Sequence, residues 1–158
     1  MSMVTEHLER LGVRFEFLPH APAASALAEA RSLALDADEV LKVLVLELET
    51  GPALAVIPAT RRLDLDLVRD ALDEKHARLA SEDEVLAHFP EFEPGALPAL
   101  PSLLHVPVVV DPAVFEHARV TFAAGSQRQS VRTEAEPLLH GATVTVAPVS
   151  RVPVGEPW

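Results

Sequence analysis

A run of aliphatic residues at positions 40–48, interrupted only by Lys42 and Glu47, gives the clearest strand prediction of this chain. Successive side chains of a strand point to opposite faces, so one face carries Val40, Lys42, Leu44, Leu46 and Leu48. A buried ammonium group is costly unless something compensates for it. Two interpretations of Lys42 therefore stay open. It is either an edge lysine whose amine reaches water, or a functional lysine in a mostly apolar pocket.

Helical and extended patterns alternate along the rest of the chain. Helices are expected over residues 3–11, after the caps Ser25 and Asp64, and after the capping box that begins at Ser81. The helix after Ser25 is expected to turn Leu27, Ala30 and Ala34 to one side. A turn at residues 49–52 should join residues 40–48 and 54–57 in a hairpin. Further strands are expected at residues 13–17, 108–110, 119–123, 131–133 and 143–146, with a polar turn at 124–130 and a helical start at 134. The interleaving favours a mixed α/β (α+β) domain over an all-helical one.

Two regions are rich in proline. Residues 89–107 contain five prolines and Gly95, which rule out a continuous helix or central strand. Long irregular segments are usually functional or disordered, and the apolar content here argues against disorder. The segment is either a functional loop or a rigid cover over an open end of the core. The tail with Pro148, Pro153 and Pro157 is expected to be loosely held.

Length and composition fit one folded domain over residues 1–158, with 49% hydrophobic and 23% charged residues. No apolar run approaches the roughly 20 residues of a membrane helix, and the N-terminal residues lack the pattern of a signal peptide. We therefore expect a cytoplasmic protein with no membrane partner. The absence of cysteine excludes disulfides and thiolate chemistry.

The formal net charge is −11, so the chain as a whole repels a polyanion. Extended binding to DNA is not expected. A nucleic-acid partner should be held over a small area, such as one end, and the acidic surplus most simply favours solubility.

Familiar catalytic motifs are missing. The seven histidines form no HxH or HExxH pattern, and Glu84 with His88 is a common chance pair. Ser126 follows a glycine but lacks the G-x-S-x-G elbow. Neither the dinucleotide nor the P-loop glycine motif occurs. We expect no metal and no cofactor, which leaves Lys42 and two irregular loops as the candidate chemistry.

The order of several short stretches resembles the YbaK and prolyl-tRNA-synthetase-associated domain family, whose members hydrolyse mischarged aminoacyl-tRNAs in trans. The resemblance runs from His20 to about Leu139. Its matching stretches are residues 20–30, 40–45, 54–59 with 63–65, 78–85, 92–98, 109–111 and 122–126. It implies a twisted mixed β-sheet or partial barrel flanked by helices.

The resemblance also implies a site. Lys42 stands where the family has its signature functional lysine. The positions expected to bind substrate are those of two loops and their surroundings, namely His20, Ser25, Gly95, Ala96, Pro98, Asp111, Gly125 and Ser126. The family often has threonine at position 25, proline at 99 and glycine at 101. The differences here leave the amino-acid selectivity open.

The implied reaction is ester hydrolysis at the 3′ end of an aminoacyl-tRNA. Water or a substrate hydroxyl would attack, and Lys42 would position the substrate or stabilise negative charge. It stays open whether the tRNA is contacted by Arg61, Arg62, Arg128 and Arg132, and whether an aminoacyl-tRNA synthetase helps. Two other classes of function also stay open. One is a non-catalytic module that binds an aminoacyl or nucleotide-like ligand, and the other is a plain interaction domain without a pocket.

Overall fold

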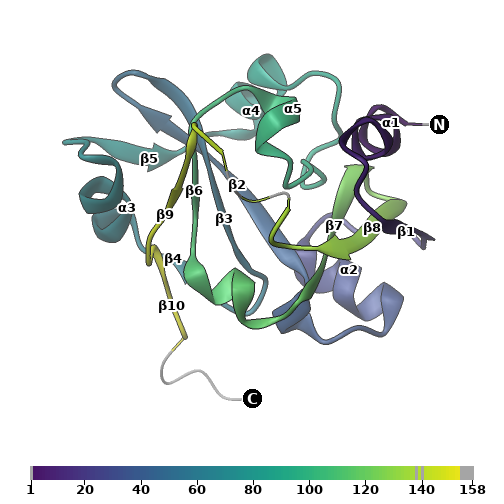
Figure 1. Cartoon of the computed structure of the whole chain (residues 1–158). Coiled ribbons are helices and arrows are strands. Elements are labelled where there is room, and N and C mark those ends of the chain that lie inside the picture. The colour runs from purple at the N-terminus through teal and green to yellow at the C-terminus, as the bar shows by residue number, and fades with distance from the viewer. Residues whose placement is uncertain (1, 138, 140, 154–158) are drawn as a thin grey trace.

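The computed structural model describes residues 2–137, 139 and 141–153. Two sheets form its frame (Figure 1). A mixed five-stranded sheet has the order β5-β2-β3-β6-β9, and a three-stranded antiparallel sheet has the order β1-β8-β7. The strands of the first are β5 (Ala77–Leu79), β2 (Leu41–Leu48), β3 (Gly51–Pro58), β6 (Val108–Val110) and β9 (Val144–Val146). Those of the second are β1 (Phe15–Pro19), β8 (Gln129–Glu134) and β7 (Arg119–Ser126). This architecture confirms the mixed α/β prediction; the large sheet is open rather than closed into a barrel.

The predicted hairpin forms the centre of the large sheet. β2 and β3 pair antiparallel from Leu41 opposite Pro58 to Leu48 opposite Gly51. β3, β6 and β9 then run parallel to one another. Alternation along β2 sends Leu41 and Val45 into the largest core cluster and Leu46 into a second cluster on the opposite face. Lys42 lies on that second face, as predicted.

Local sequence signals explain where the helices begin. Ser2 and Ser81 form capping boxes for α1 (Met3–Leu11) and α4 (Glu82–His88). Ser25 caps α2 (Ala26–Leu33), and Asp64 caps α3 (Leu65–Leu72). The predicted starts after residues 25, 64 and 81 are therefore confirmed.

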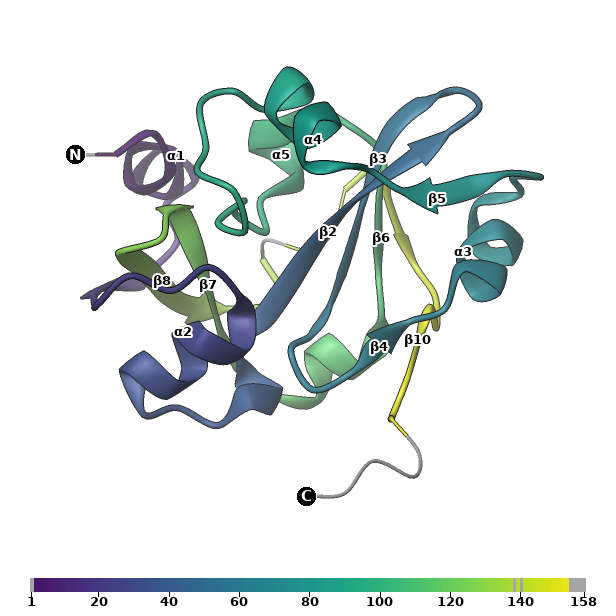
Figure 2. The ribbon, with the colours of Figure 1, turned by 180° about the vertical axis from the view of Figure 1, so that it is seen from behind.

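The three-stranded sheet has two different faces. Its apolar face, which includes Val120, Phe122 and Val131, joins the largest core cluster. Figure 2 shows α2 and the 3₁₀ turn η1 (Ala37–Glu39) beside this sheet, and Figures 1 and 2 both place α3 at the far end of the large sheet. Between α2 and the sheet lies a polar contact, in which the Ser130 hydroxyl donates to the carboxylate of Glu29.

Some sequence predictions were wrong or incomplete. Of the predicted face of α2, Ala30 is buried but Leu27 is 47% exposed, because Ala26 and Glu29 are the other residues that α2 turns inward. Residues 135–137 form a bend and a turn, not a helical start. The irregular region 89–107 contains one short helix, α5 (Pro101–Leu104).

The tail also differs from expectation. Val149 and Ser150 are buried, and β10 (Ser150–Arg151) pairs with β4 (Arg62–Leu63). The prediction of a loose tail is therefore wrong for these residues. Pro157 lies outside the described residues.

Candidate functional site

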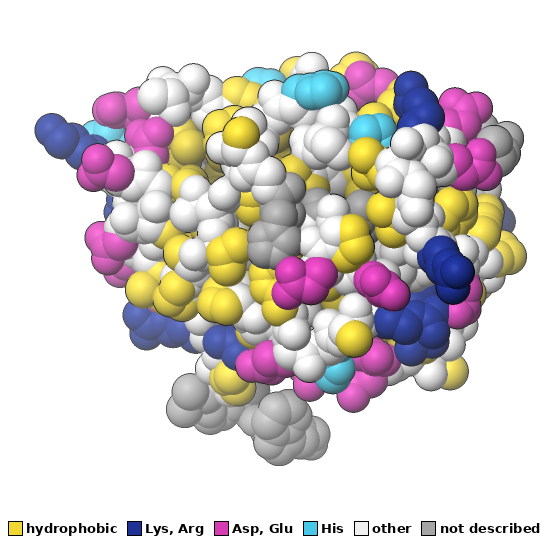
Figure 3. Space-filling view, viewed as in Figure 1, with side chains coloured by type: hydrophobic (Ala, Val, Ile, Leu, Met, Phe, Trp, Pro, Cys, Tyr) yellow, Lys and Arg dark blue, Asp and Glu magenta, His cyan; other side chains and the backbone are white. Residues whose placement is uncertain are grey.

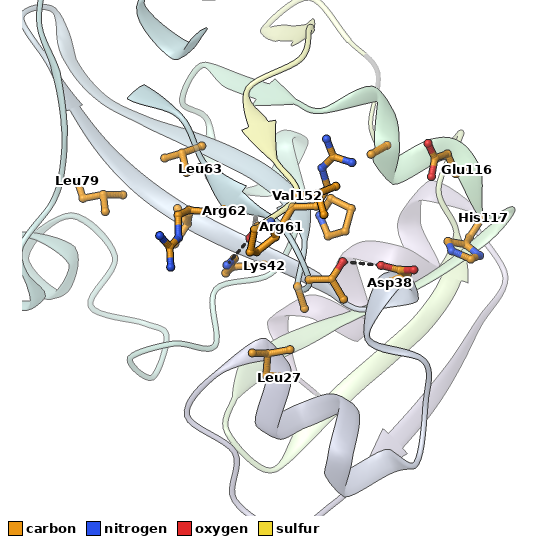
Figure 4. A pocket seen from close by; sticks show the side chains of 16 residues that line it. Leu27, Asp38, Lys42, Arg61, Arg62, Leu63, Leu79, Glu116, His117 and Val152 are labelled. Carbon is orange, nitrogen blue, oxygen red and sulfur yellow. Dashed lines mark hydrogen bonds between the residues drawn. The ribbon is translucent and has the colours of Figure 1, made fainter. Parts of the chain in front are cut away.

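A cavity of about 920 Å³ opens on the second face of the large sheet. Figure 4 shows residues from α2, β2, the β3–β4 turn and the C-terminal segment pointing toward it. Most of its wall is apolar, formed by Leu27, Leu44, Pro58, Ala59, Leu63, Leu79, Ala113, Val152 and Pro153. The polar side chains are Asp38, Lys42, Thr60, Arg61, Arg62, Glu116 and His117. An apolar hollow with a few convergent polar groups is the usual form of a small-molecule site.

Lys42 places an ammonium group at the wall of this cavity, which Arg61 and Arg62 also line. Its ammonium donates to the main-chain oxygen of Arg61, with 2.9 Å between the nitrogen and the oxygen (Figure 4). Burial, and to a lesser degree the charge of Arg62, holds the pKa of Lys42 below its ordinary value. The amine is therefore fixed at the cavity wall rather than extended into bulk water.

Two further contacts order the rim. The Thr60 hydroxyl donates to Asp38, which joins the β3–β4 turn to η1 (Figure 4). The guanidinium of Arg61 donates from Nε to the Ser150 hydroxyl at 2.8 Å and from Nη2 to the Ser150 carbonyl at 3.3 Å. Arg61 thus links the Lys42 amine to the C-terminal strand.

The two predicted glycine loops contact each other. The amide of Gly125 donates to the carbonyl of Ala96, and the amide of Glu93 donates to the carbonyl of Gly125, both at 2.9 Å. Gly95 lies so close to Ala24 that an added Cβ would come within 2.2 Å of the Ala24 carbonyl oxygen. The loops therefore meet each other and the segment before α2.

These loops do not contribute to the cavity wall. Gly95, Ala96, Pro98, Gly125 and Ser126 are absent from the described residues that line it. Lys42 is brought to the cavity, while the loops form a second structural unit beside α2. Their predicted role in binding substrate stays a prediction.

The other predicted site residues have local partners. His20 bonds through Nε2 to the Ser130 hydroxyl at 2.8 Å, and Ser25 caps α2. Asp111 is 2% exposed and accepts hydrogen bonds from Ala113, Val149 and Ser150. None of these three predicted residues is among the described residues of the cavity wall.

Several cavity residues were missed from the sequence. Leu27 was placed only on one side of a predicted helix, with Ala30 and Ala34, and Val152 fell in the tail that was expected to be loosely held. Asp38 and Glu116 stand in short 3₁₀ turns that no apolar period marks. Arg61 and Arg62, adjacent basic residues in an acidic chain, had been named from the sequence as open candidates for tRNA contacts.

In the part of the chain that the structure describes, no group of three or more His, Asp or Glu side chains converges on a point. Glu84 and His88, which are four residues apart, have different partners: Glu84 accepts hydrogen bonds from Arg78, and His88 contacts Glu47. No described helix is long and apolar enough to cross a membrane.

Known structures share this fold. The crystal structure of the hypothetical protein APE2540 matches with a TM-score of 0.83 at 23% identity, covering 94% of this chain and 99% of that one. A crystal structure described as "a putative trans-editing enzyme for prolyl tRNA synthetase" matches with a TM-score of 0.78 at 24% identity, covering 94% of each chain. A search of curated proteins found no match.

The sequence itself matches a family model. Residues 20–140 fit the model described as the aminoacyl-tRNA editing domain. This span contains Lys42, both glycine loops and most of the cavity wall. The chain therefore belongs to the aminoacyl-tRNA editing domain family.

Proposed function

We propose that this chain is a trans-acting deacylase that hydrolyses the ester of mischarged aminoacyl-tRNA. The observation that carries the proposal is the Lys42 ammonium, held by the Arg61 carbonyl at the wall of an apolar cavity. Membership of the editing-domain family supports the substrate class.

Lys42 would act on the carbonyl oxygen of the ester. An ammonium group has three N–H donors, and the bond to Arg61 uses one of them. Another can donate to the ester carbonyl, where negative charge grows during attack. A donor fixed before the reaction stabilises that charge more effectively than mobile water does.

The nucleophile would be water or a hydroxyl of the substrate. The chain has no cysteine, and the cavity wall includes no serine among the residues that the structure describes. Thr60 does line the cavity, but its hydroxyl donates to Asp38. A covalent acyl-enzyme is therefore not part of the proposal.

The charge distribution favours a grip on the tRNA end alone. On the face seen in Figure 3, Lys and Arg side chains are interspersed with Asp and Glu. Arg62 lines the cavity and has an exposed side chain, so it can meet a phosphate near the 3′ end.

The test compares wild type, Lys42→Ala and Lys75→Ala on a panel of mischarged tRNAs. Lys75 is the other lysine of the chain and is exposed, so it controls for loss of positive charge. We expect Lys42→Ala to lower kcat by about 100-fold or more, the usual effect of removing one oxyanion donor. Lys75→Ala should keep wild-type activity.

Two results would contradict the proposal: wild type that hydrolyses none of the esters, or Lys42→Ala with unimpaired turnover. Protection of a mischarged ester by wild type, without turnover, would instead identify a non-catalytic binding module.

A further inference from the structure

The C-terminal segment, residues 147–153, lies beyond the matched family region yet forms part of the candidate site. The match to the family model covers residues 20–140. Val149 is fully buried, and its carbonyl accepts a hydrogen bond from the amide of Asp64 at 2.8 Å. Val152 and Pro153 then line the Lys42 cavity. The segment is thus both anchored and in contact with the site.

Asp111 holds this segment in place through hydrogen bonds to Val149 and Ser150. Its Oδ2 accepts from the Val149 amide at 3.0 Å and from the Ser150 hydroxyl at 2.6 Å, while Oδ1 accepts from the Ala113 amide at 2.9 Å. Burial opposes ionisation of Asp111, but these hydrogen bonds outweigh it and hold the pKa of the carboxyl below its ordinary value. The group is therefore a charged acceptor that fixes the direction of the Ser150 hydroxyl.

The Ser150 hydroxyl, held by Asp111, in turn accepts a hydrogen bond from Arg61. Because its hydrogen points to Asp111, its oxygen is free to accept from Arg61 Nε, at 2.8 Å. The Ser150 carbonyl accepts from the same guanidinium at 3.3 Å. Two contacts to one planar group restrain the Arg61 residue, whose own carbonyl receives the Lys42 ammonium.

We propose that Asp111 and Ser150 are positioning residues, which hold Arg61 so that its carbonyl keeps the Lys42 ammonium at the cavity wall. Neither residue needs to touch the substrate. The importance of this arrangement for ester hydrolysis rests on the proposed function. The inference that Asp111 and Ser150 fix the position of the Lys42 amine does not depend on the proposed function.

The first test observes Lys42 directly, without any tRNA. Protein labelled with ¹³C at lysine Cε gives two lysine signals, Lys42 and Lys75. In Ser150→Ala the amine should be released to water, so the pKa of Lys42 should rise toward its ordinary value, with the Lys75 signal as the internal reference. Ser150→Thr keeps the hydroxyl and should restore the wild-type titration.

The second test measures deacylation with the same variants. Ser150→Ala should lower kcat by between about tenfold and 100-fold with little change in KM, because misplacement of a reacting group affects the transition state most. Ser150→Thr should recover most of the activity. A purely structural role would change the melting temperature but not the Lys42 titration.

Arg61→Met covers the case in which Ser150→Ala does not fold. It leaves the bonds of Asp111 to Val149 and Ser150 in place and removes only the guanidinium contacts. It should release Lys42 in the same way. An unchanged Lys42 titration in a folded variant would overturn this inference, whatever the activity. If the Lys42 titration changes in the variants but wild type hydrolyses no ester, the proposed function is refuted and this inference stands.

Discussion

Lys42 and Glu29 are both ionisable side chains withdrawn from water, but their surroundings differ. Lys42 faces a cavity of about 920 Å³ and donates to a fixed carbonyl. Glu29 is 4% exposed and closed in by the three-stranded sheet, where the Ser130 hydroxyl donates to it and also contacts His20. One group is accessible to a ligand, and the other is sealed.

The difference shows that a shifted pKa alone does not identify a site. Burial raises the pKa of Glu29 to about 7, and the bond from Ser130 opposes that rise only in part. Strong shifts often mark functional groups. Here the pronounced shift belongs to a group that is absent from the described cavity wall, so access and geometry decide in favour of Lys42.

The largest effect on stability that we expect comes from Glu29→Gln. Between pH 4.5 and about 7, the folded chain holds on Glu29 a proton that the unfolded chain has lost. The free energy of unfolding of wild type should therefore fall as pH rises through this range, by about 3 kcal/mol from this group. Glu29→Gln should lack that part of the fall, as measured by urea unfolding at several pH values.

Glu91→Gln provides the control, because Glu91 is exposed. Its stability should follow wild type at every pH. If the curves of Glu29→Gln and wild type run parallel from pH 4.5 to 8, the contrast between a sealed carboxyl and an open amine is wrong.

Gly95→Ala tests a contact next to α2, the helix shared by the Lys42 cavity and the buried Glu29. Gly95 has a φ of +74° and lies against Ala24, one residue before the cap of α2, the helix that carries both Leu27 and Glu29. A methyl group would meet the Ala24 backbone, so we expect a loss of at least about 2 kcal/mol in the free energy of unfolding.

Gly12→Ala is the matched control, because Gly12 has a φ of +70° with nothing near its added Cβ. It should cost only about 1 kcal/mol. Equal losses in the two variants would mean that the close approach to Ala24 contributes nothing.

The smallest effect on the free energy of unfolding is expected at Lys42, which faces the cavity. Lys42→Met removes a partly buried cation, so we expect the free energy of unfolding at pH 7 to rise by up to about 1 kcal/mol while deacylation is lost. The folded pKa of Lys42 is below 10.5, so wild type should gain stability as pH rises toward that value, and the advantage of Met should shrink. Unfolding at pH 7, 9 and 10, with Lys75→Met beside it, measures this. An advantage that does not change with pH would contradict it.

Local signals predicted much of the fold. The caps Asp64 and Ser81 and the β2–β3 hairpin depend on neighbours in the sequence, and each was predicted. The inward side of α2 was not, because Glu29 is buried and its polar partner there is Ser130, which is 101 residues away. The packing of Ser150 depends equally on a distant partner, Asp111.

Of the residues that line the cavity, the sequence pointed to Lys42 and, as open candidates for tRNA contacts, to Arg61 and Arg62. A single lysine among aliphatic residues indicated Lys42, because a charge in that position needs an explanation. Leu27, Asp38 and Val152 reach the same cavity from three separate parts of the chain. No periodicity within one segment contains that information.

The pairing of β1 with β8 has a consequence for the rate of folding. The hairpin of β2 and β3 joins across a short turn, so its strands meet at little cost in chain entropy. β1 must instead find a strand near the opposite end of the described chain, with Phe15 opposite Thr133. Such distant pairing is slow, so the hairpin should be ordered early, and the contact between Ser130 of β8 and Glu29 should form among the last events of folding.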